Sequence, residues 1–374
     1  MFPFYTSLSL LLLFNSFSSS FARPNPRTLI TIIPVSHNNA TWHEFERFLD
    51  VGKGDGVVTG ISELKSYFHQ FGYLELRDTD MNFTDIFDEN FELAVFRYQS
   101  KLGLPGTGKF DSITISQIMS PRCGVRDDAH KLHATEHFNY FNGKPRWSRR
   151  TPMKLIYAFS KNNWIEHLDI NDIKAIFQRA FVRWASVIPV TFSETIEYHK
   201  ADIKIGFYRG DHGDGRPFDG LLGVLGHGFA PKSGRLHLDA AETWAVDFGS
   251  EKSMVAVDLE SVATHEIGHV LGLAHTSVKD AVMYPSLSPR TKNVELKLDD
   301  IEGVQDLYGS NPNFSFSYLL ESDTSSSSNL KLGLRTFRSK WSHVNVPAKE
   351  MTYLIDPGGS RSKLSGPNSS ELMA

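Results

Sequence analysis

The stretch that decides the fold is HEIGHVLGLAH, residues 265–275. His265 and His269 are four residues apart, so on a helix both side chains project from one face, about one turn apart. Gly272 can adopt the left-handed conformation that ends a helix, and the turn that follows would bring His275 to the same point. Three imidazoles with a fourth position open for water form the ligand set of a catalytic zinc site.

Glu266 is the candidate catalytic residue. It adjoins the first histidine, where it would take a proton from a zinc-bound water. Zinc lowers the pKa of such a water to roughly 7 and polarises a substrate carbonyl. The alternative for an isolated HExxH is two helix-surface histidines beside a glutamate in a salt bridge. The complete HExxHxxGxxH pattern argues against that alternative and predicts hydrolysis by an activated water.

Met283 lies eight residues beyond the third histidine, in AVMYPS. A methionine in an apolar patch is ordinary core filler, but after this histidine triad it resembles the Met-turn beneath the metal in metzincins. Other motifs narrow the resemblance to the matrix metalloproteinase family, and to its plant-type members with a prodomain and no haemopexin-like domain. The resemblance covers roughly residues 41–309. It implies an α+β fold, in which a small helical-bundle prodomain precedes a catalytic domain with a twisted, mostly parallel five-stranded sheet and three helices.

The periodicity of apolar residues predicts individual elements. Spacings of three and four residues in 59–71 and 85–102 are typical of small helical bundles. The character of the chain changes at Thr151, after which strands and helices alternate. Strands are expected at 154–159 and 201–208, and helices at 169–187, 261–273 and 298–308.

Four segments are expected along the chain. An apolar run in residues 1–22 is too short to span a membrane and predicts a cleaved signal peptide. Residues 23–150 are expected to be a propeptide with a peptidoglycan-binding-like helical bundle, and residues 151–311 the metalloprotease domain. The Ser-rich residues 312–374 are expected to be a disordered tail. A net charge of −4 with no large basic surface argues against nucleic-acid binding.

The chain has a single cysteine, Cys123, which is unusual for a secreted protein. It is a free thiol, an intermolecular partner or a metal ligand. Its segment PRCGVRD resembles the cysteine switch PRCGxPD of matrix metalloproteinases, in which the thiolate is the fourth zinc ligand and keeps the precursor latent. Arg122 and Asp127, which pair in the family, are present, but Arg126 replaces the proline that would stiffen the segment. Cleavage in the linker 128–150 is expected to release the thiolate.

A Gly-, Asp- and His-rich segment offers a second set of cation ligands. Three imidazoles and one carboxylate form a closed set suited to structural zinc, namely His212, Asp214, His227 and His237. Hard oxygen ligands suit calcium. The resemblance assigns one calcium site to the carboxylates of Asp219, Asp239 and Glu242 and to backbone oxygens near Gly220, Leu222 and Val224. The alternative is a polar surface loop with scattered histidines.

Two features concern substrate binding. Ser261 is four residues before the first zinc ligand, and in the family this position shapes the floor of the pocket for the side chain after the cleaved bond. Its small size predicts a deep pocket favouring Leu, Met or aromatic residues. A strand expected at 222–229 would form the upper edge of the cleft, where an extended peptide can pair through its backbone.

Two charged segments have alternative interpretations. Asp299 and Asp300 begin the last predicted helix, where acidic side chains favour the macrodipole. The resemblance adds an ion pair with the N-terminus of the mature enzyme. RWSRR, residues 146–150, is either a basic processing site or an ordinary polar linker.

The sequence therefore predicts a secreted zinc endopeptidase, made as a latent zymogen, that cleaves proteins of the extracellular space, extracellular matrix or cell wall. Expected partners are these substrates, an activating protease and proteinase inhibitors. The C-terminal residues of this sequence lack the apolar segment that a lipid anchor requires, so no membrane anchor is expected. Sequons at Asn39, Asn82, Asn313 and Asn368 fit the secretory route. The alternatives are a catalytically weak or inactive binding protein with this fold, and a metzincin of another branch. Those other branches usually depend on disulfides, so a chain with a single cysteine argues against them.

Overall fold

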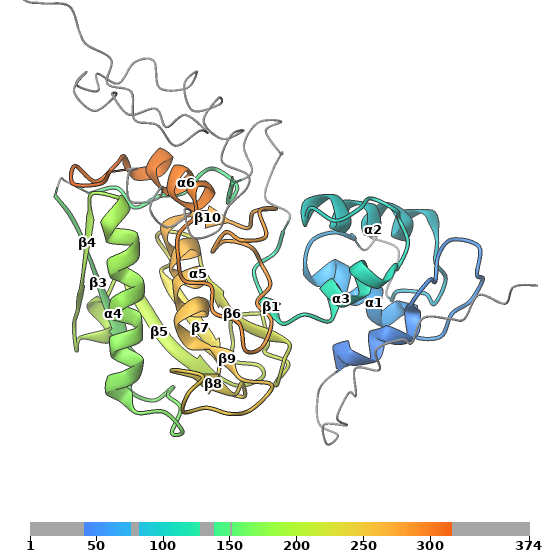
Figure 1. Ribbon diagram of the computed structural model, residues 1–374, viewed down its shortest axis with the longest axis horizontal. Helices are drawn as coiled ribbons and strands as arrows, with labels where there is room; N and C mark the ends of the chain where they lie inside the picture. The colour runs from blue at the N-terminus through green and yellow to red at the C-terminus, as the bar shows by residue number, and fades with distance from the viewer. Residues whose placement is uncertain (1–40, 76–81, 128–137, 150–151, 316–374) are drawn as a thin grey trace, which may run out of the picture.

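The computed structural model describes residues 41–75, 82–127, 138–149 and 152–315 (Figure 1). The predicted signal peptide, the tail beyond residue 315 and the sequons at Asn39 and Asn368 lie outside the described residues. Figure 1 shows a helical N-terminal domain beside a larger domain of strands and helices. Within the described ranges, no helix is long and apolar enough to cross a membrane.

The N-terminal domain is a small helical bundle, as predicted. Its elements are a 3₁₀ helix η1 (Thr41–Phe48) and helices α1 (Ile61–Gln70), α2 (Glu89–Lys101) and α3 (Ser112–Ile118). The carboxylates of Asp88 and Asp111 accept backbone hydrogen bonds at the starts of α2 and α3 and so fix where these helices begin. The core is aromatic, and Phe68 and Phe91 meet edge to face with their ring centroids 5.2 Å apart.

The catalytic domain is built on one twisted sheet. Its strands are β3 (Met153–Phe159), β4 (Val190–Glu194), β5 (Ile203–Tyr208), β6 (Val224–Gly228) and β7 (Arg235–Asp239). They lie in the order β6-β7-β5-β3-β4, and every pair is parallel except β6 and β7. Short strands complete the domain: β2 (Asn139–Tyr140), β8 (Trp244–Ala245), β9 (Val257–Asp258) and β10 (Leu273–Ala274), with a 3₁₀ turn η2 (Tyr198–Lys200).

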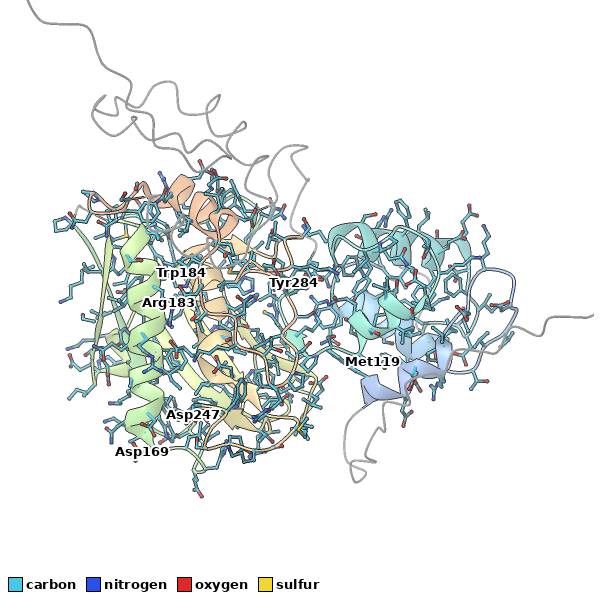
Figure 2. The ribbon with its side chains drawn as sticks, in the orientation of Figure 1. Met119, Asp169, Arg183, Trp184, Asp247 and Tyr284 are labelled. Atoms are coloured by element: carbon cyan, nitrogen blue, oxygen red, sulfur yellow. The ribbon has the colours of Figure 1, made fainter. Side chains whose placement is uncertain are left out.

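Three helices complete this domain: α4 (Ile170–Val187), α5 (Leu259–Leu271) and α6 (Leu298–Tyr308). In Figures 1 and 2, α4 and α5 run side by side, and Trp184 lies on α4. The Trp184 indole is fully buried, and its Nε1–H donates to the carbonyl of Thr264 on α5 at 2.9 Å. A buried indole needs such a partner, so this bond helps hold the two helices against each other.

The α+β class, the mostly parallel sheet with five strands from this domain and the three helices agree with prediction, and a sixth strand from outside the domain extends the sheet. The sixth is β1 (Arg122–Cys123), which comes from the N-terminal domain and pairs parallel to β6. The N–H of Gly124 donates to the carbonyl of Gly226 at 2.8 Å. Because an edge strand has unpaired backbone groups, the N-terminal segment can extend the sheet at the edge where a substrate is expected.

The two domains also meet beside β1. Tyr284 lies on the side of the catalytic domain that faces the N-terminal domain (Figure 2). Its hydroxyl donates to the side-chain oxygen of Gln117 at 3.0 Å, and the Gln117 amide donates to the Ser286 hydroxyl at 2.7 Å. The loop after Met283 therefore contacts helix α3 directly.

Candidate active site

Helix α5 carries the first two histidines of the motif. The Asp258 carboxylate caps it by accepting from the N–H of Ser261 at 2.8 Å. The helix ends at Leu271, and Gly272 has a φ of 112°, in the left-handed region that favours glycine. A Cβ at residue 272 would also lie 2.4 Å from the carbonyl oxygen of Pro145. Both the backbone angle and the neighbouring chain therefore require glycine at this turn.

Each of the three histidines has one ring nitrogen held by an oxygen and the other facing the common centre. Nδ1 of His265 lies 2.6 Å from the carbonyl of Val282, and Nδ1 of His269 lies 2.8 Å from the carbonyl of Leu273. Nδ1 of His275 lies 2.5 Å from a carboxylate oxygen, described below. These oxygens can only accept, so each Nδ1 carries the proton and each Nε2 presents a lone pair. Carbonyl and carboxylate partners of this kind orient the histidines of metal sites.

The lone pairs converge. Nε2 of His269 lies 3.1 Å from Nε2 of His275 and 3.3 Å from Sγ of Cys123. Ligand atoms of these residues and His265 all lie within 4.8 Å of one another. Burial lowers the pKa of His265 to about 3, so its ring is neutral. Imidazole lone pairs this close together repel one another, so the arrangement favours a cation at its centre.

Asp127 joins the N-terminal domain to this cluster. Its carboxylate accepts from the Tyr73 hydroxyl at 2.7 Å, from Nη2 of Arg122 at 2.7 Å and from Nδ1 of His275 at 2.5 Å. Burial acts to raise the pKa of Asp127, but the neighbouring Arg122 and His275 outweigh it and hold the pKa well below its ordinary value. The pair of Arg122 and Asp127 implied by the family is present. The contact with His275 was not predicted.

Glu266 lies beside the cluster with its carboxylate fully buried. Neither oxygen accepts a hydrogen bond of normal geometry from the described residues, and burial raises its pKa to about 8. Met283 is buried below α5, where a Cβ at Gly268 would lie 2.2 Å from its sulfur. The structure therefore places a base candidate and the Met-turn candidate around the same three histidines.

A second cluster forms from the Gly- and His-rich segment. Nε2 of His212, Nε2 of His227 and Nδ1 of His237 lie 2.9, 2.9 and 2.8 Å from the same oxygen, Oδ2 of Asp214. Nδ1 of His212 lies 2.9 Å from the carbonyl of Gly210, which orients the ring with its Nε2 toward the carboxylate. Burial lowers the pKa of His227 to about 3 and that of His237 to about 4. These neutral rings and one carboxylate are a suitable donor set for a cation.

The three carboxylates expected at a calcium site lie beside the 219–224 turn, where Asp239 and Glu242 are buried and Asp219 is half-buried. Asp219 accepts from the N–H of Val224 at 2.8 Å, Asp239 from that of Gly220 at 3.1 Å and Glu242 from that of Leu222 at 2.8 Å. Burial raises the pKa of Asp239 to about 6, and Oε2 of Glu242 has no partner among the described residues. Unlike the two histidine clusters, the three carboxylates do not form a group whose ligand atoms all lie within 4.8 Å of one another. A cation here would need the backbone oxygens as well.

The expected substrate pocket lies next to Cys123. Its walls are formed by α5, β6 and the chain after Met283, and it is lined by Leu225, Ser261, Val262, Tyr284, Pro285, Ser286, Leu287 and Asn293. The Ser261 hydroxyl is buried, donates to Asp258 at 2.6 Å and accepts from the N–H of Asn293 at 2.8 Å. Asn293 therefore closes the space behind Ser261.

The remaining predicted positions lie on the surface or in the linker. Asn82 and Asn313 are exposed. Trp147 of the RWSRR segment is buried and donates from Nε1 to the carbonyl of Val270 at 2.9 Å, and Arg146 donates to the carbonyl of Leu307 at 2.9 Å. The segment is thus fastened to the catalytic domain. Asp300 is buried and accepts from the N–H groups of residues 282, 283 and 297.

Comparison with known proteins agrees with this geometry. Residues 146–309 match the family model described as matrixin, and residues 58–118 match a putative peptidoglycan binding domain. The chain is 59% identical to Metalloendoproteinase 4-MMP of Arabidopsis thaliana, over 71% of this chain and 77% of the relative. It is 54% identical to Metalloendoproteinase 1-MMP of the same plant, over 79% of this chain and 80% of the relative. Human neutrophil collagenase is 36% identical over 66% of this chain and 49% of its own length.

The two matched models follow one another along this chain, and the Arabidopsis relatives are more than 50% identical over most of both chains. The chain therefore belongs to the matrix metalloproteinase family of zinc endopeptidases.

Proposed function

We propose that this chain is the latent, secreted precursor of a zinc endopeptidase whose catalytic zinc is held by His265, His269, His275 and Cys123. The observation that carries the proposal is the convergence of three Nε2 lone pairs and one thiol in a buried space. The side-chain set is that of a catalytic zinc site with its open position filled by sulfur. Zinc bound there would polarise a peptide carbonyl and lower the pKa of a water.

Glu266 supplies the proton transfers of the proposed reaction. After the cysteine segment leaves, its carboxylate faces the vacated position, takes a proton from water and later delivers it to the leaving amine. Neither oxygen accepts a hydrogen bond of normal geometry from the described residues, which leaves both available for this task. The free edge of β6 would bind an extended substrate through backbone hydrogen bonds. In the precursor, β1 occupies this edge and Cys123 occupies the fourth ligand position, so one segment blocks both.

The position of the activating cut follows from the contacts of the linker. Residues 139–140 pair with β10, and Trp147 is buried against α5. Proteolysis at RWSRR would have to break these contacts, which favours a cut between Asp127 and Asn139. A protease of the extracellular space is the proposed activator, and proteinase inhibitors of the mature enzyme are proposed partners.

We assign the second cluster, His212, Asp214, His227 and His237, to a structural zinc, which makes two zinc ions per chain. Calcium is proposed at Asp219, Asp239 and Glu242 with backbone oxygens of Gly220, Leu222 and Val224. The exposed sequons at Asn82 and Asn313 are proposed glycosylation sites, in keeping with secretion. Extracellular matrix or cell-wall proteins are the proposed substrates.

The test of latency uses Cys123→Ser. Wild-type precursor should hydrolyse a quenched peptide at a rate near background, and a mercurial that binds thiols should raise that rate at least ~100-fold, because it removes the sulfur from the metal. The variant precursor should be active without any reagent. Since Cys123 is the single cysteine of the chain, the mercurial should leave the variant unchanged. Equal latency of both precursors would contradict the proposal.

A further inference from the structure

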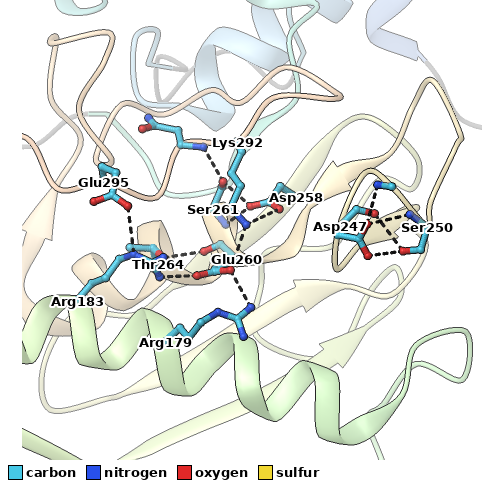
Figure 3. Close-up of polar contacts among 12 residues, drawn as sticks. Arg179, Arg183, Asp247, Ser250, Asp258, Glu260, Ser261, Thr264, Lys292 and Glu295 are labelled. Carbon is cyan, nitrogen blue, oxygen red and sulfur yellow. Dashed lines mark hydrogen bonds and ion pairs between the residues drawn. The ribbon is translucent and has the colours of Figure 1, made fainter. Parts of the chain in front are cut away.

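A second buried carboxylate lies on α5, away from the histidines. The Glu260 side chain is 3% exposed. Figure 3 shows it between two arginines of α4 and one lysine of a loop. Its oxygens lie 2.8 Å from Nη2 of Arg179, 2.5 Å from Nη1 of Arg183 and 3.1 Å from Nζ of Lys292. The proposed reaction makes no use of this group.

The lysine belongs to the stretch after the Met-turn, residues 284–297, which we call the pocket loop. Lys292 also lies 3.4 Å from Oδ2 of Asp258, the residue that caps α5. The next residue, Asn293, donates its N–H to the Ser261 hydroxyl at 2.8 Å and its side-chain amide to the carbonyl of Ala281 at 3.2 Å. Two consecutive loop residues are therefore fastened to the first turn of α5 and its surroundings.

The charges of this group explain why the loop is held. Burial acts to raise the pKa of Glu260, but hydrogen bonds from Arg179, Arg183 and Lys292 outweigh it and lower the pKa to about 2. The carboxylate is thus charged and buried, a state that needs cationic partners. Two of them sit on the rigid helix α4, and Lys292 alone comes from the loop.

The pocket loop is also one wall of the substrate pocket. Tyr284, Pro285, Ser286, Leu287 and Asn293 face Ser261, Val262 and Leu225 across it. The position of the loop relative to α5 therefore decides how far a side chain can enter. The hydrogen bond from the N–H of Asn293 to the Ser261 hydroxyl joins this wall to the wall formed by α5.

We propose that Glu260 is a positioning residue that holds the pocket loop against α5 through Lys292, so that the pocket favours Leu or Met over bulky aromatic side chains after the cleaved bond. The inference rests on the proposed function for the identity of the pocket, and on the contacts of Glu260 for the mechanism. Release of the loop would widen the pocket and admit larger side chains.

The first test is Lys292→Met, which removes the charge and keeps most of the aliphatic stem. Two quenched peptides that differ only in Leu or Trp after the scissile bond are compared with activated enzyme. The ratio of their kcat/KM values should fall about five-fold or more, within the range that pocket fit controls. The change should come from KM, with kcat for the Leu peptide within about two-fold of wild type, because Glu266 and the histidines are untouched.

Two matched variants separate this role from a general loss of charge. Lys200→Met removes an exposed ion pair with Glu197, 2.7 Å long, and should leave the ratio unchanged. Lys292→Arg should retain most of the selectivity. Glu260→Gln should lower the ratio of kcat/KM values at least as far as Lys292→Met does. The double variant should lower the ratio little further, because both substitutions break the same ion pair. An unchanged ratio in folded, active Lys292→Met enzyme would overturn the inference.

A measurement without substrate makes the test independent of the proposed function. Amide hydrogen exchange, followed by mass spectrometry, should be faster across the pocket loop in Lys292→Met than in Lys200→Met. Absence of peptide hydrolysis by activated wild-type enzyme would refute the proposed function, whereas equal exchange in the two variants would refute the positioning role.

Discussion

The two histidine clusters of this protein use similar donors but differ in where those donors come from. One cluster lies within a single stretch of 26 residues that includes β6, the start of β7 and the loop before β6. Its members are His212, Asp214, His227 and His237. The other cluster combines two residues of α5, one residue after β10 and Cys123, which lies 146 residues away from its neighbour His269. The first set can close within one domain, whereas the second is complete only while the N-terminal domain is docked.

The cluster with Cys123 is buried throughout and the other is half-buried at His212 and Asp214, yet burial has the same effect on one histidine of each. Burial lowers the pKa of His227 and of His265 alike to about 3, so each cluster holds a neutral imidazole that can bind a metal. The difference lies in the neighbouring carboxylates. Oδ2 of Asp214 contacts all three histidines of its own cluster, whereas neither oxygen of Glu266 accepts a hydrogen bond of normal geometry from the described residues. Chemistry is therefore expected at one cluster and structural support at the other.

The largest expected effect is that of Glu266→Gln. Peptide hydrolysis by the activated enzyme should fall about 10²–10⁴-fold, because the amide cannot accept the proton of the water. Zinc content, measured by plasma mass spectrometry, should stay at two per chain, and the unfolding temperature should change little. Glu197→Gln, on the surface, is the control and should keep full activity. Retention of more than a few per cent of turnover in Glu266→Gln would remove this residue from the mechanism.

Asp214→Ala tests the structural cluster. Zinc content should drop from two to one, and the unfolding temperature should fall by about 5–10 °C, as loss of roughly 2–3 kcal/mol does in a domain of this size. The decrease in activity at low temperature should be smaller than for Glu266→Gln. If the variant instead keeps both zinc ions and its stability, the four residues are an ordinary polar cluster.

Asp127→Asn tests the link between the domains and should have the smallest of these effects. The amide can still bond to Arg122 but no longer offers a carboxylate to His275. We expect zinc in the precursor to exchange into a chelator about ten-fold faster, in line with the loss of a partner behind a metal-binding histidine. Enzyme activated from either precursor should lose zinc at the same rate, since the substituted segment has gone. A difference in the rate of zinc loss that persists after activation would show that the effect does not come from the contact between Asp127 and His275.

The local features of the site are predictable from the sequence. Helix α6 begins and ends at the predicted residues, and α5 begins two residues early because Asp258 caps it. The turn at Gly272 follows from the need for a left-handed residue. Each of these depends on residues within one or two helical turns, where spacing alone predicts which side chains meet.

The contacts between residues far apart in the sequence cannot be predicted from spacing. The bond between Asp127 and His275 joins residues 148 positions apart, and the pair of Arg179 and Glu260 joins residues 81 positions apart on two helices. The addition of β1 to the sheet likewise depends on how the domains dock. No periodicity in the sequence records such pairings, because they depend on the packed arrangement of elements.

The several contacts of the N-terminal domain have a consequence for the kinetics of activation. In the intact precursor, the linker keeps Cys123 at an effective concentration that short tethers bring to the millimolar range. A cut in the linker turns this into an ordinary bimolecular equilibrium, but β1 on β6, Asp127 on His275 and Gln117 on Ser286 still hold the two pieces together. The cut protein would thus behave as an enzyme with a dissociable inhibitor. Its activity per molecule would rise on dilution, so that the local concentration of the cut protein, as well as the cut itself, would set when it works.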